Sequence, residues 1–172
     1  MRIEESEKLD YNDVLIRPKR STLSSRKDVV LHRTFKFANG NEWTGVPIVA
    51  ANMDTTGTLE MARELSEKDM LTCLSKHIDH WDSDADCKNK NIIPTFGMCE
   101  SDEERLLSSQ GSLITMEWMM HKDFICLDVA NGYSEKFVEF VQDVRKKWPK
   151  KTIIAGNVVT GEMVEALILA GA

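Results

Sequence analysis

The sequence predicts an α/β fold built on parallel strands, and three observations carry this prediction. Short apolar runs recur along the chain, amphipathic helical patterns separate them, and successive units are spaced by roughly 20–30 residues. The runs are continuous rather than alternating, which is typical of strands covered on both faces. The strands are expected at residues 47–51, 71–74, 92–96, 124–129 and 152–155.

Each expected helix begins at a residue that can cap it and continues as an apolar stripe with helical spacing. The helices are expected over residues 58–67, from 101 onward, over 134–148 and over 160–170. Thr58 is expected to cap the first helix, Ser101 and Glu104 to form a capping box for the second, and Gly171 to be a left-handed C-cap of the last. The last two helical patterns begin at Ser134 and Thr160.

This alternation leaves two architectures, an open doubly wound sheet and a (β/α) barrel. No GxGxxG sequence follows the first strand, which disfavours the dinucleotide-binding form of the open sheet. Residues 14–17 and 29–37 are expected to form an extended pair around the polar turn 19–27, covering one end of the sheet. Residues 78–91 are acidic and predict at most a short helix.

The chain is expected to form one domain over residues 1–172, with an N-terminal extension 1–45 and βα units over 46–172. A complete (β/α)8 TIM barrel has eight units and typically about 250 residues, and only about the first five units are recognised here. We therefore expect the N-terminal part of a longer protein.

Composition excludes several classes of function. The 172 residues carry a formal charge of −6, with a pI of about 5.3, which disfavours a nucleic-acid partner. No run of 18 apolar residues predicts a membrane span, and the first 20 residues lack the apolar core of a secretory signal. The four cysteines lack CxxC spacing, so a zinc site or disulfide framework is not expected and a reducing cytosol is the default.

Polar side chains follow the predicted strands, at the edge where α/β proteins bind ligands. Lys76 follows the second strand and Asp128 ends the fourth. Alternate barrel strands send side chains into the same layer, so the two groups could meet. They could hold a charged ligand or relay a proton, or they could form a structural ion pair; spacing alone leaves both open.

Other reactive residues give weaker signals. Cys73 and Cys126 lie inside strands and are expected to be inert core thiols, and Cys87 is expected in a polar loop. The basic segment 17–27, which includes Ser25 and Arg26, is interpreted first as a solvated turn and second as a phosphate contact.

Several strings resemble one family of enzymes. They are LDYNDVLIRPKRSTLSSR, GVPIVAANMDTTGT, SKH, FICLDVANGYSEKFVEFVQDVRKKWP and AGNVVTGEMVEALILAGA. Over residues 9–77 and 124–172 the chain resembles the N-terminal part of proteins of the IMP dehydrogenase/GMP reductase family. It resembles the reductases of that family more than the dehydrogenases. The dehydrogenases usually carry a regulatory domain after the second βα unit, where this chain has only the short stretch 78–91.

The resemblance implies a cytosolic, homotetrameric (β/α)8 barrel that uses NADPH to convert GMP to IMP and ammonia in purine salvage. In the family, a cysteine on the loop after the sixth strand attacks the purine C2, and hydride then resolves the adduct. The resemblance places that loop, a monovalent-cation (K⁺) site and the GMP phosphate-binding glycines beyond Ala172. The chain alone is therefore expected to be inactive, with no metal site of its own.

The resemblance also assigns roles residue by residue. Lys76 and Asp128 would flank the ammonia and the nicotinamide, and the strand end that continues into Val129 and Ala130 would contact the dinucleotide. The remaining assignments are Ser25 and Arg26 to NADPH, Met53 to the neighbourhood of the purine, and Gly156 and Asn157 to the strand end beside the substrate.

The resemblance is weakest in the third βα unit, since 78–99 is shorter and 108–122 longer than usual. The alternative of a different class is a non-catalytic half-barrel that binds nucleotide or dimerises through an open edge strand. A third interpretation, oxidation of IMP with NAD, is disfavoured by the absence of room for the inserted domain.

Overall fold

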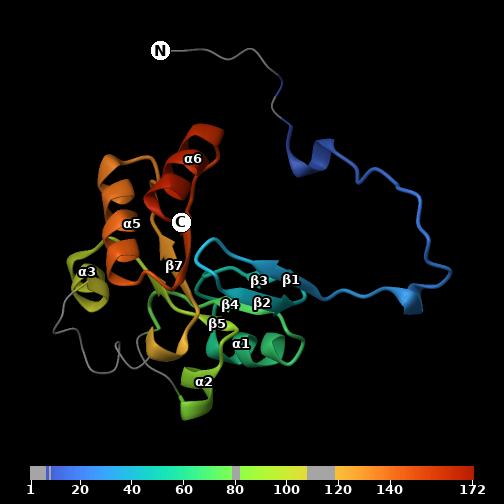
Figure 1. The fold of residues 1–172 in the computed structure, drawn as a ribbon, viewed down its shortest axis with the longest axis horizontal. Coiled ribbons are helices and arrows are strands. Elements are labelled where there is room, and N and C mark those ends of the chain that lie inside the picture. Colours follow the sequence, from blue (N-terminus) through green and yellow to red (C-terminus); the bar gives the residue numbers. More distant parts are fainter. Residues whose placement is uncertain (1–6, 8, 79–81, 108–118) are drawn as a thin grey trace. The chain divides into compact units, whose positions relative to one another are not determined.

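The computed structural model describes residues 7, 9–78, 82–107 and 119–172 (Figure 1). The chain divides into two compact units, Met1–Val30 and Leu31–Ala172. The first contains two short 3-10 helices, η1 (Tyr11–Asp13) and η2 (Arg26–Asp28), each closed by a capping box. Among the described residues, no helix is long and apolar enough to cross a membrane.

The second unit contains an antiparallel hairpin and two parallel sheets of three strands each (Figure 1). The hairpin joins β1 (Arg33–Lys36) to β2 (Glu42–Gly45). One sheet has the order β3 (Val49–Ala50), β4 (Leu71–Cys73), β5 (Ile92–Ile93). The other has the order β6 (Thr95–Phe96), β7 (Phe124–Asp128), β8 (Thr152–Gly156). The helices are α1 (Leu59–Ser66), α2 (Asp84–Lys88), α3 (Glu100–Leu107), α5 (Glu135–Lys147) and α6 (Gly161–Ala170).

The parallel α/β class is confirmed, and the expected strand 92–96 is divided at Pro94. Its first half pairs with β4 and its second half with β7. Proline has no N–H to donate to a ladder, but its carbonyl still accepts a hydrogen bond from the backbone of Cys126 at 3.0 Å. One extended segment thus serves both sheets.

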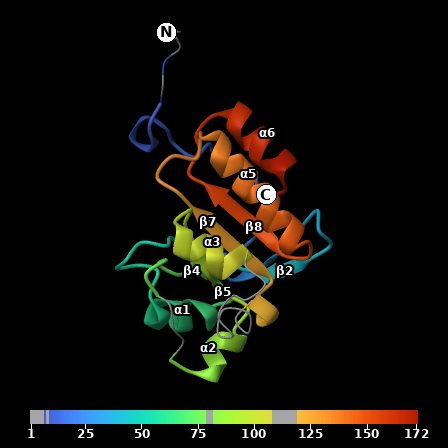
Figure 2. The same cartoon turned by 90° about the vertical axis from the view of Figure 1, so that its left-hand side faces the viewer.

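Strand β7 shows why the apolar runs are continuous. Phe124 and Cys126 face a cluster shared with Trp43 of the hairpin, whereas Ile125 and Leu127 face a larger cluster built with α3, α5 and α6. Figure 2 shows α5 and α6 side by side near β7 and β8. Because successive side chains of a strand point to opposite faces, a strand covered on both faces has no polar positions to alternate.

The N-terminal extended pair was placed wrongly by the sequence pattern. Residues 14–17 form no strand, and the antiparallel pair consists of β1 and β2. Side-chain amides in the turn between them donate hydrogen bonds near the start of β8. Asn39 donates to Thr152 Oγ1 at 3.1 Å, and Asn41 donates to the Lys150 carbonyl at 2.9 Å. Phe37 packs edge-on against Phe124, with ring centroids 5.3 Å apart. The hairpin therefore covers the amino ends of β7 and β8, the covering role expected of the misplaced pair.

Most helix ends follow the expected caps. Thr58 accepts a hydrogen bond from the Met61 N–H, Ser134 from the Phe137 N–H, and Gly171 is left-handed with φ 117°. The expected capping box of Ser101 and Glu104 is wrong, because α3 begins at Glu100 and Ser101 therefore lies inside the helix.

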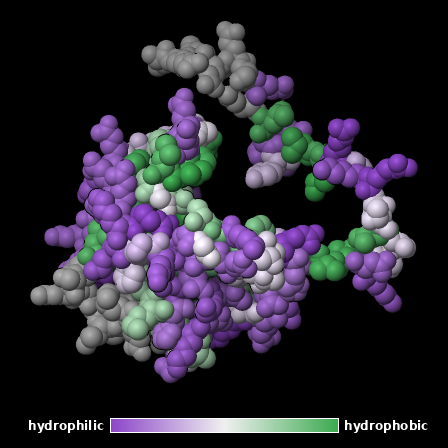
Figure 3. All heavy atoms as spheres, in the orientation of Figure 1, coloured by the Kyte–Doolittle hydropathy of each residue, from purple (hydrophilic) through white to green (hydrophobic). Residues whose placement is uncertain are grey.

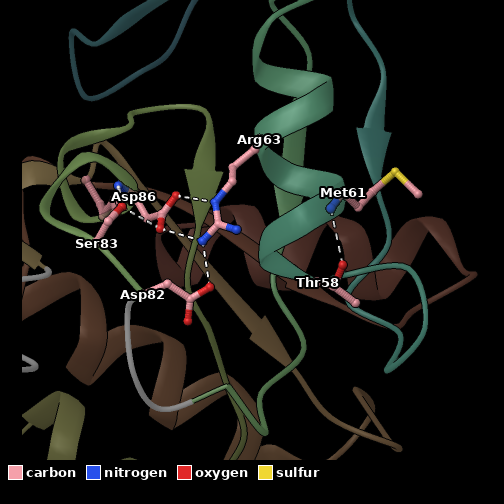
Figure 4. Close-up of polar contacts among 7 residues, drawn as sticks. Thr58, Met61, Arg63, Asp82, Ser83 and Asp86 are labelled. Atoms are coloured by element: carbon pink, nitrogen blue, oxygen red, sulfur yellow. Dashed lines mark hydrogen bonds and ion pairs between the residues drawn. The ribbon is translucent and has the colours of Figure 1, made fainter.

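An ion-pair cluster fixes the short helix α2 against α1 (Figure 4). Arg63 of α1 donates to both carboxylate oxygens of Asp86, at 2.9 and 2.8 Å, and to Asp82 at 2.6 Å. Asp86 is buried, and its contact with Arg63 lowers the pKa of its carboxyl group. Residues 82–91 thus contribute a short helix, as expected, held by charge rather than by a large apolar face.

Candidate functional site

Lys76 and Asp128 line one cavity of about 610 Å³ at the carboxyl ends of β4 and β7. The cavity lies wholly within the second compact unit. Its volume falls within the range of small-molecule and cofactor sites. Its other lining residues are His77, Gly97, Met98, Cys99, Ser101, Asp102, Arg105, Val129, Ala130, Asn131 and Ser134.

The position of Lys76 is set by the residue before it. Ser75 is buried, its N–H donates to the Gly57 carbonyl at 2.8 Å, and its hydroxyl donates to Asp54 Oδ1 at 2.9 Å. Gly57 is required at this contact, since a Cβ there would lie 2.5 Å from the Cys73 carbonyl. The chain turns after Ser75 and leaves the Lys76 side chain exposed at the cavity.

Asp128 is the last residue of β7 and is half-buried. It pairs in register with Gly156 of β8, which fixes its backbone in the sheet. No ion pair joins Lys76 to Asp128 in the described part of the chain. The structural ion pair left open by the sequence is therefore not what the structure shows, and both charges face a shared space.

Val129 and Ala130 also line the cavity. The next residues form a turn in which the Tyr133 N–H donates to Asn131 Oδ1 at 3.0 Å, and Ser134 then caps α5. Helices α3 and α5 thus both begin beside the cavity.

Gly156 and Asn157 adjoin the cavity strand without lining the cavity. The Val129 N–H donates to the Gly156 carbonyl at 3.0 Å, and the Val159 N–H donates to the Tyr133 hydroxyl at 2.9 Å. Hydrogen bonds with Thr160 and the Val159 backbone lower the pKa of Tyr133. The loops after β7 and β8 are therefore tied together.

Met53 does not line the cavity, and Ser25 and Arg26 belong to the other compact unit. Met53 is exposed in the turn after β3, where its carbonyl accepts from the N–H of Gly57 at 2.7 Å. Ser25 and Arg26 belong to the N-terminal unit, where Ser25 caps η2 by accepting from the Lys27 N–H at 3.2 Å. Their contact with NADPH stays a prediction.

Sequence reasoning missed two charged residues of the cavity wall, Asp102 and Arg105. Asp102 is buried, and its carboxylate accepts from the Gly97 N–H at 2.7 Å. Arg105, one turn along α3, lies 3.4 Å from Asp102 and places its guanidinium 5.6 Å from the centroid of the Phe96 ring. The i, i+3 spacing of an acid and an arginine was the available signal, but it is common on solvated helices.

The cysteines are placed mostly as expected. Cys73 and Cys126 are buried core residues in contact with one another, and this contact together with burial raises the pKa of the Cys73 thiol. The prediction that Cys87 lies in a polar loop is wrong, because Cys87 is buried on α2. The described ranges contain no group of three or more His, Cys, Asp or Glu able to hold a metal ion.

Comparisons with known proteins place this α/β unit in an enzyme family. The family described as "IMP dehydrogenase / GMP reductase domain" matches residues 8–172, and the chain belongs to that family. Among curated relatives, GMP reductase of Enterobacter sp. (strain 638) is 52% identical and GMP reductase of Salmonella typhi is 50% identical. Each match spans 100% of this chain and 50% of the relative, so the chain corresponds to about half the length of these relatives, their N-terminal part.

A solved structure supports the fold. The inosine 5′-monophosphate dehydrogenase of Legionella pneumophila superposes with a TM-score of 0.67 at 24% identity, covering 94% of this chain and 47% of that one. The parallel α/β fold is therefore shared with that protein, whereas the number of barrel units stays a prediction.

Proposed function

We propose that the chain is the N-terminal part of a GMP reductase, an enzyme that converts GMP to IMP and ammonia with NADPH. The overall reaction replaces the C2 amino group of the purine by hydrogen: GMP + NADPH + 2 H⁺ gives IMP + NADP⁺ + NH₄⁺. The observation that carries the proposal is the placement of Lys76 and Asp128, from two different strands, on one cavity without a direct ion pair. The names of the relatives at about 50% identity support the choice of substrate.

Lys76 and Asp128 supply complementary chemistry at the cavity. An ammonium group donates hydrogen bonds and stabilises negative charge, whereas a carboxylate accepts hydrogen bonds and can take up or deliver a proton. The departing ammonia needs a proton, so an acid–base pair beside it is the chemistry that this step requires. We assign both residues to the catalytic machinery, with Lys76 also contacting the cofactor.

The cavity residues fit the nicotinamide end of NADPH. The volume of about 610 Å³ suits a ring with its ribose, Asp128 can accept from hydroxyl or amide groups, and Lys76 offers a cation. NADPH would supply hydride to the purine. Val129 and Ala130 would hold it at the strand end, Ser25 and Arg26 would contact it further from the ring, and Met53, Gly156 and Asn157 would lie on the GMP side.

Other properties are proposed by resemblance to the family. They are a homotetramer, a cytosolic location and a K⁺ site in the full-length enzyme. The cysteine that attacks the purine would come from the second half of such an enzyme. We therefore propose that residues 1–172 alone bind NADPH but do not turn over GMP.

Two measurements on the isolated chain test the proposal. Loss of NADPH absorbance in the presence of GMP should stay at the rate of the buffer blank, and measurable turnover would contradict the assignment of the nucleophile to another part of the enzyme. Titration of NADPH into the chain, followed by nicotinamide fluorescence, should show saturable binding. A folded chain that leaves the fluorescence unchanged would contradict the cofactor site.

A second candidate function is a non-catalytic half-barrel that binds nucleotide or dimerises. It is favoured by an apolar groove of about 610 Å³ that includes Trp43, Val49 and Ile154 in its lining. Within the described residues β8 pairs only with β7, and Ile168 and Leu169 of α6 are 60% and 79% exposed. Figure 3 shows a green, hydrophobic patch over α6. A chain that is dimeric by light scattering yet indifferent to NADPH would favour this candidate.

A further inference from the structure

We infer that Arg105 is an anion-binding residue of the cavity and receives the phosphate that adjoins the nicotinamide ribose. The inference rests on the proposed function, since it assigns an orientation to the same cofactor in the same cavity. Neither the sequence pattern nor the resemblance to the family assigns a role to Arg105.

Two cationic side chains reach the cavity from different elements. Lys76 follows β4, and Arg105 comes from the last turn of α3. Asp128 lines the same cavity, and its carboxylate can accept hydrogen bonds from hydroxyl and amide groups. A ligand that satisfies all three carries a hydroxyl or amide part and an anionic part, as a phosphorylated nucleoside does.

The guanidinium of Arg105 is held in place before any ligand arrives. Its Nη1 lies 3.4 Å from Asp102 Oδ1, and its Cζ lies over the Phe96 ring, 5.6 Å from the ring centroid. Asp102 is itself fixed, because it is buried and accepts from the Gly97 N–H at 2.7 Å. A fixed guanidinium loses less side-chain entropy when it binds a phosphate, and its fork geometry matches phosphate oxygens.

The Asp102–Arg105 contact alone does not account for this arrangement. An ordinary i, i+3 ion pair on a helix surface faces solvent. Asp102 and Arg105 instead both line the cavity, and the Arg105 side chain is only 25% exposed. The geometry points to Asp102 as the residue that positions Arg105.

Phosphate-bearing and phosphate-free forms of the same reduced ring test the inference. Reduced nicotinamide mononucleotide carries the phosphate and reduced nicotinamide riboside lacks it. Dissociation constants from nicotinamide fluorescence should show the wild-type chain binding the mononucleotide about tenfold more tightly. Arg105→Gln should remove most of that difference, and Arg105→Lys should retain part of it because the charge remains but the fork is lost.

The matched control is Lys136→Gln. Lys136 is 68% exposed, pairs with Glu103 of α3 at 3.6 Å and does not line the cavity, so the substitution changes the net charge equally near the same helix. It should leave both dissociation constants unchanged. Thermal unfolding of each variant verifies that the chain is folded.

The outcomes separate the inference from the proposed function. If NADPH binds and Arg105→Gln binds both reduced ligands as the wild type does, the inference is overturned and the cofactor site stands. If the wild type binds no reduced nicotinamide, the proposed function fails; pyrophosphate is then titrated by calorimetry. If the wild type binds pyrophosphate and Arg105→Gln does not, the result would still support an anion site at Arg105. If the wild type does not bind pyrophosphate, the inference is overturned as well.

Discussion

Lys122 should make the stability of this protein rise with pH in the alkaline range. Its side chain is fully buried, and Nζ donates to the carbonyls of Asp86 and Asn89, at 2.8 and 2.6 Å, at the end of α2. Burial lowers the pKa of Lys122 from 10.5 to about 8. The folded chain therefore loses this proton near pH 8, whereas the unfolded chain keeps it until about pH 10.5.

The sign and size of the effect follow from this difference. Between pH 8 and 10.5 the unfolded state binds more protons, so the free energy of unfolding increases with pH. A change from 10.5 to about 8 corresponds to about 3 kcal/mol at 1.36 kcal/mol for each pH unit. Below pH 8 both states are protonated and the burial penalty is fully present.

Urea unfolding of the wild type and of Lys122→Met, at several values between pH 7 and 10, measures this contribution. Burial also lowers the pKa of Lys151 and, together with the contact with Cys126, raises the pKa of Cys73, but both groups are common to the two proteins and cancel in the difference. Because pH 10 stops short of the unfolded-state pKa, the wild type should gain about 2.5 kcal/mol relative to Lys122→Met across this range. Parallel pH profiles would refute the reasoning.

Three further predictions concern packing and helix ends, each read by urea unfolding. Phe137→Ala should lower the free energy of unfolding by about 3–5 kcal/mol, because Phe137 is fully buried in the largest cluster; a loss below 1 kcal/mol would contradict that packing. Thr58→Ala should cost about 1 kcal/mol through the lost cap of α1, and no loss would contradict the cap. Gly171→Ala should destabilise, since φ is +117° and a Cβ would lie 2.7 Å from Arg145, whereas the control Gly161→Ala has open space; equal effects would contradict the left-handed cap.

The parallel strands and their helices could be predicted because their signals are local. The apolar run that became β7 and the cap at Thr58 each depend on residues close together in the sequence. The prediction that residues 14–17 form one strand of the extended pair was wrong, because this segment is as apolar as a strand. Which segments pair depends on contacts that Asn39 and Asn41 make with residues distant in the sequence.

The candidate site was predicted in part for the same reason. Lys76 and Asp128 follow recognisable strands, so topology alone brings them to one edge. Arg105 and the buried Lys122 gave no such signal. Their environments depend on Phe96, on the carboxylate of Asp102 and on carbonyls of α2, which lie together only after folding. Charged residues on an amphipathic helix otherwise look like a solvated surface.

The central claim is that Lys76 and Asp128 belong to one NADPH site, and a fluorescence titration of NADPH tests it most directly. Lys76→Met should weaken binding about tenfold or more, since a charged hydrogen-bond donor is lost, while Lys68→Met, an exposed lysine that does not line the cavity, should bind as the wild type does. Asp128→Asn should also weaken binding. Unchanged affinity in folded Lys76→Met and Asp128→Asn would contradict the account.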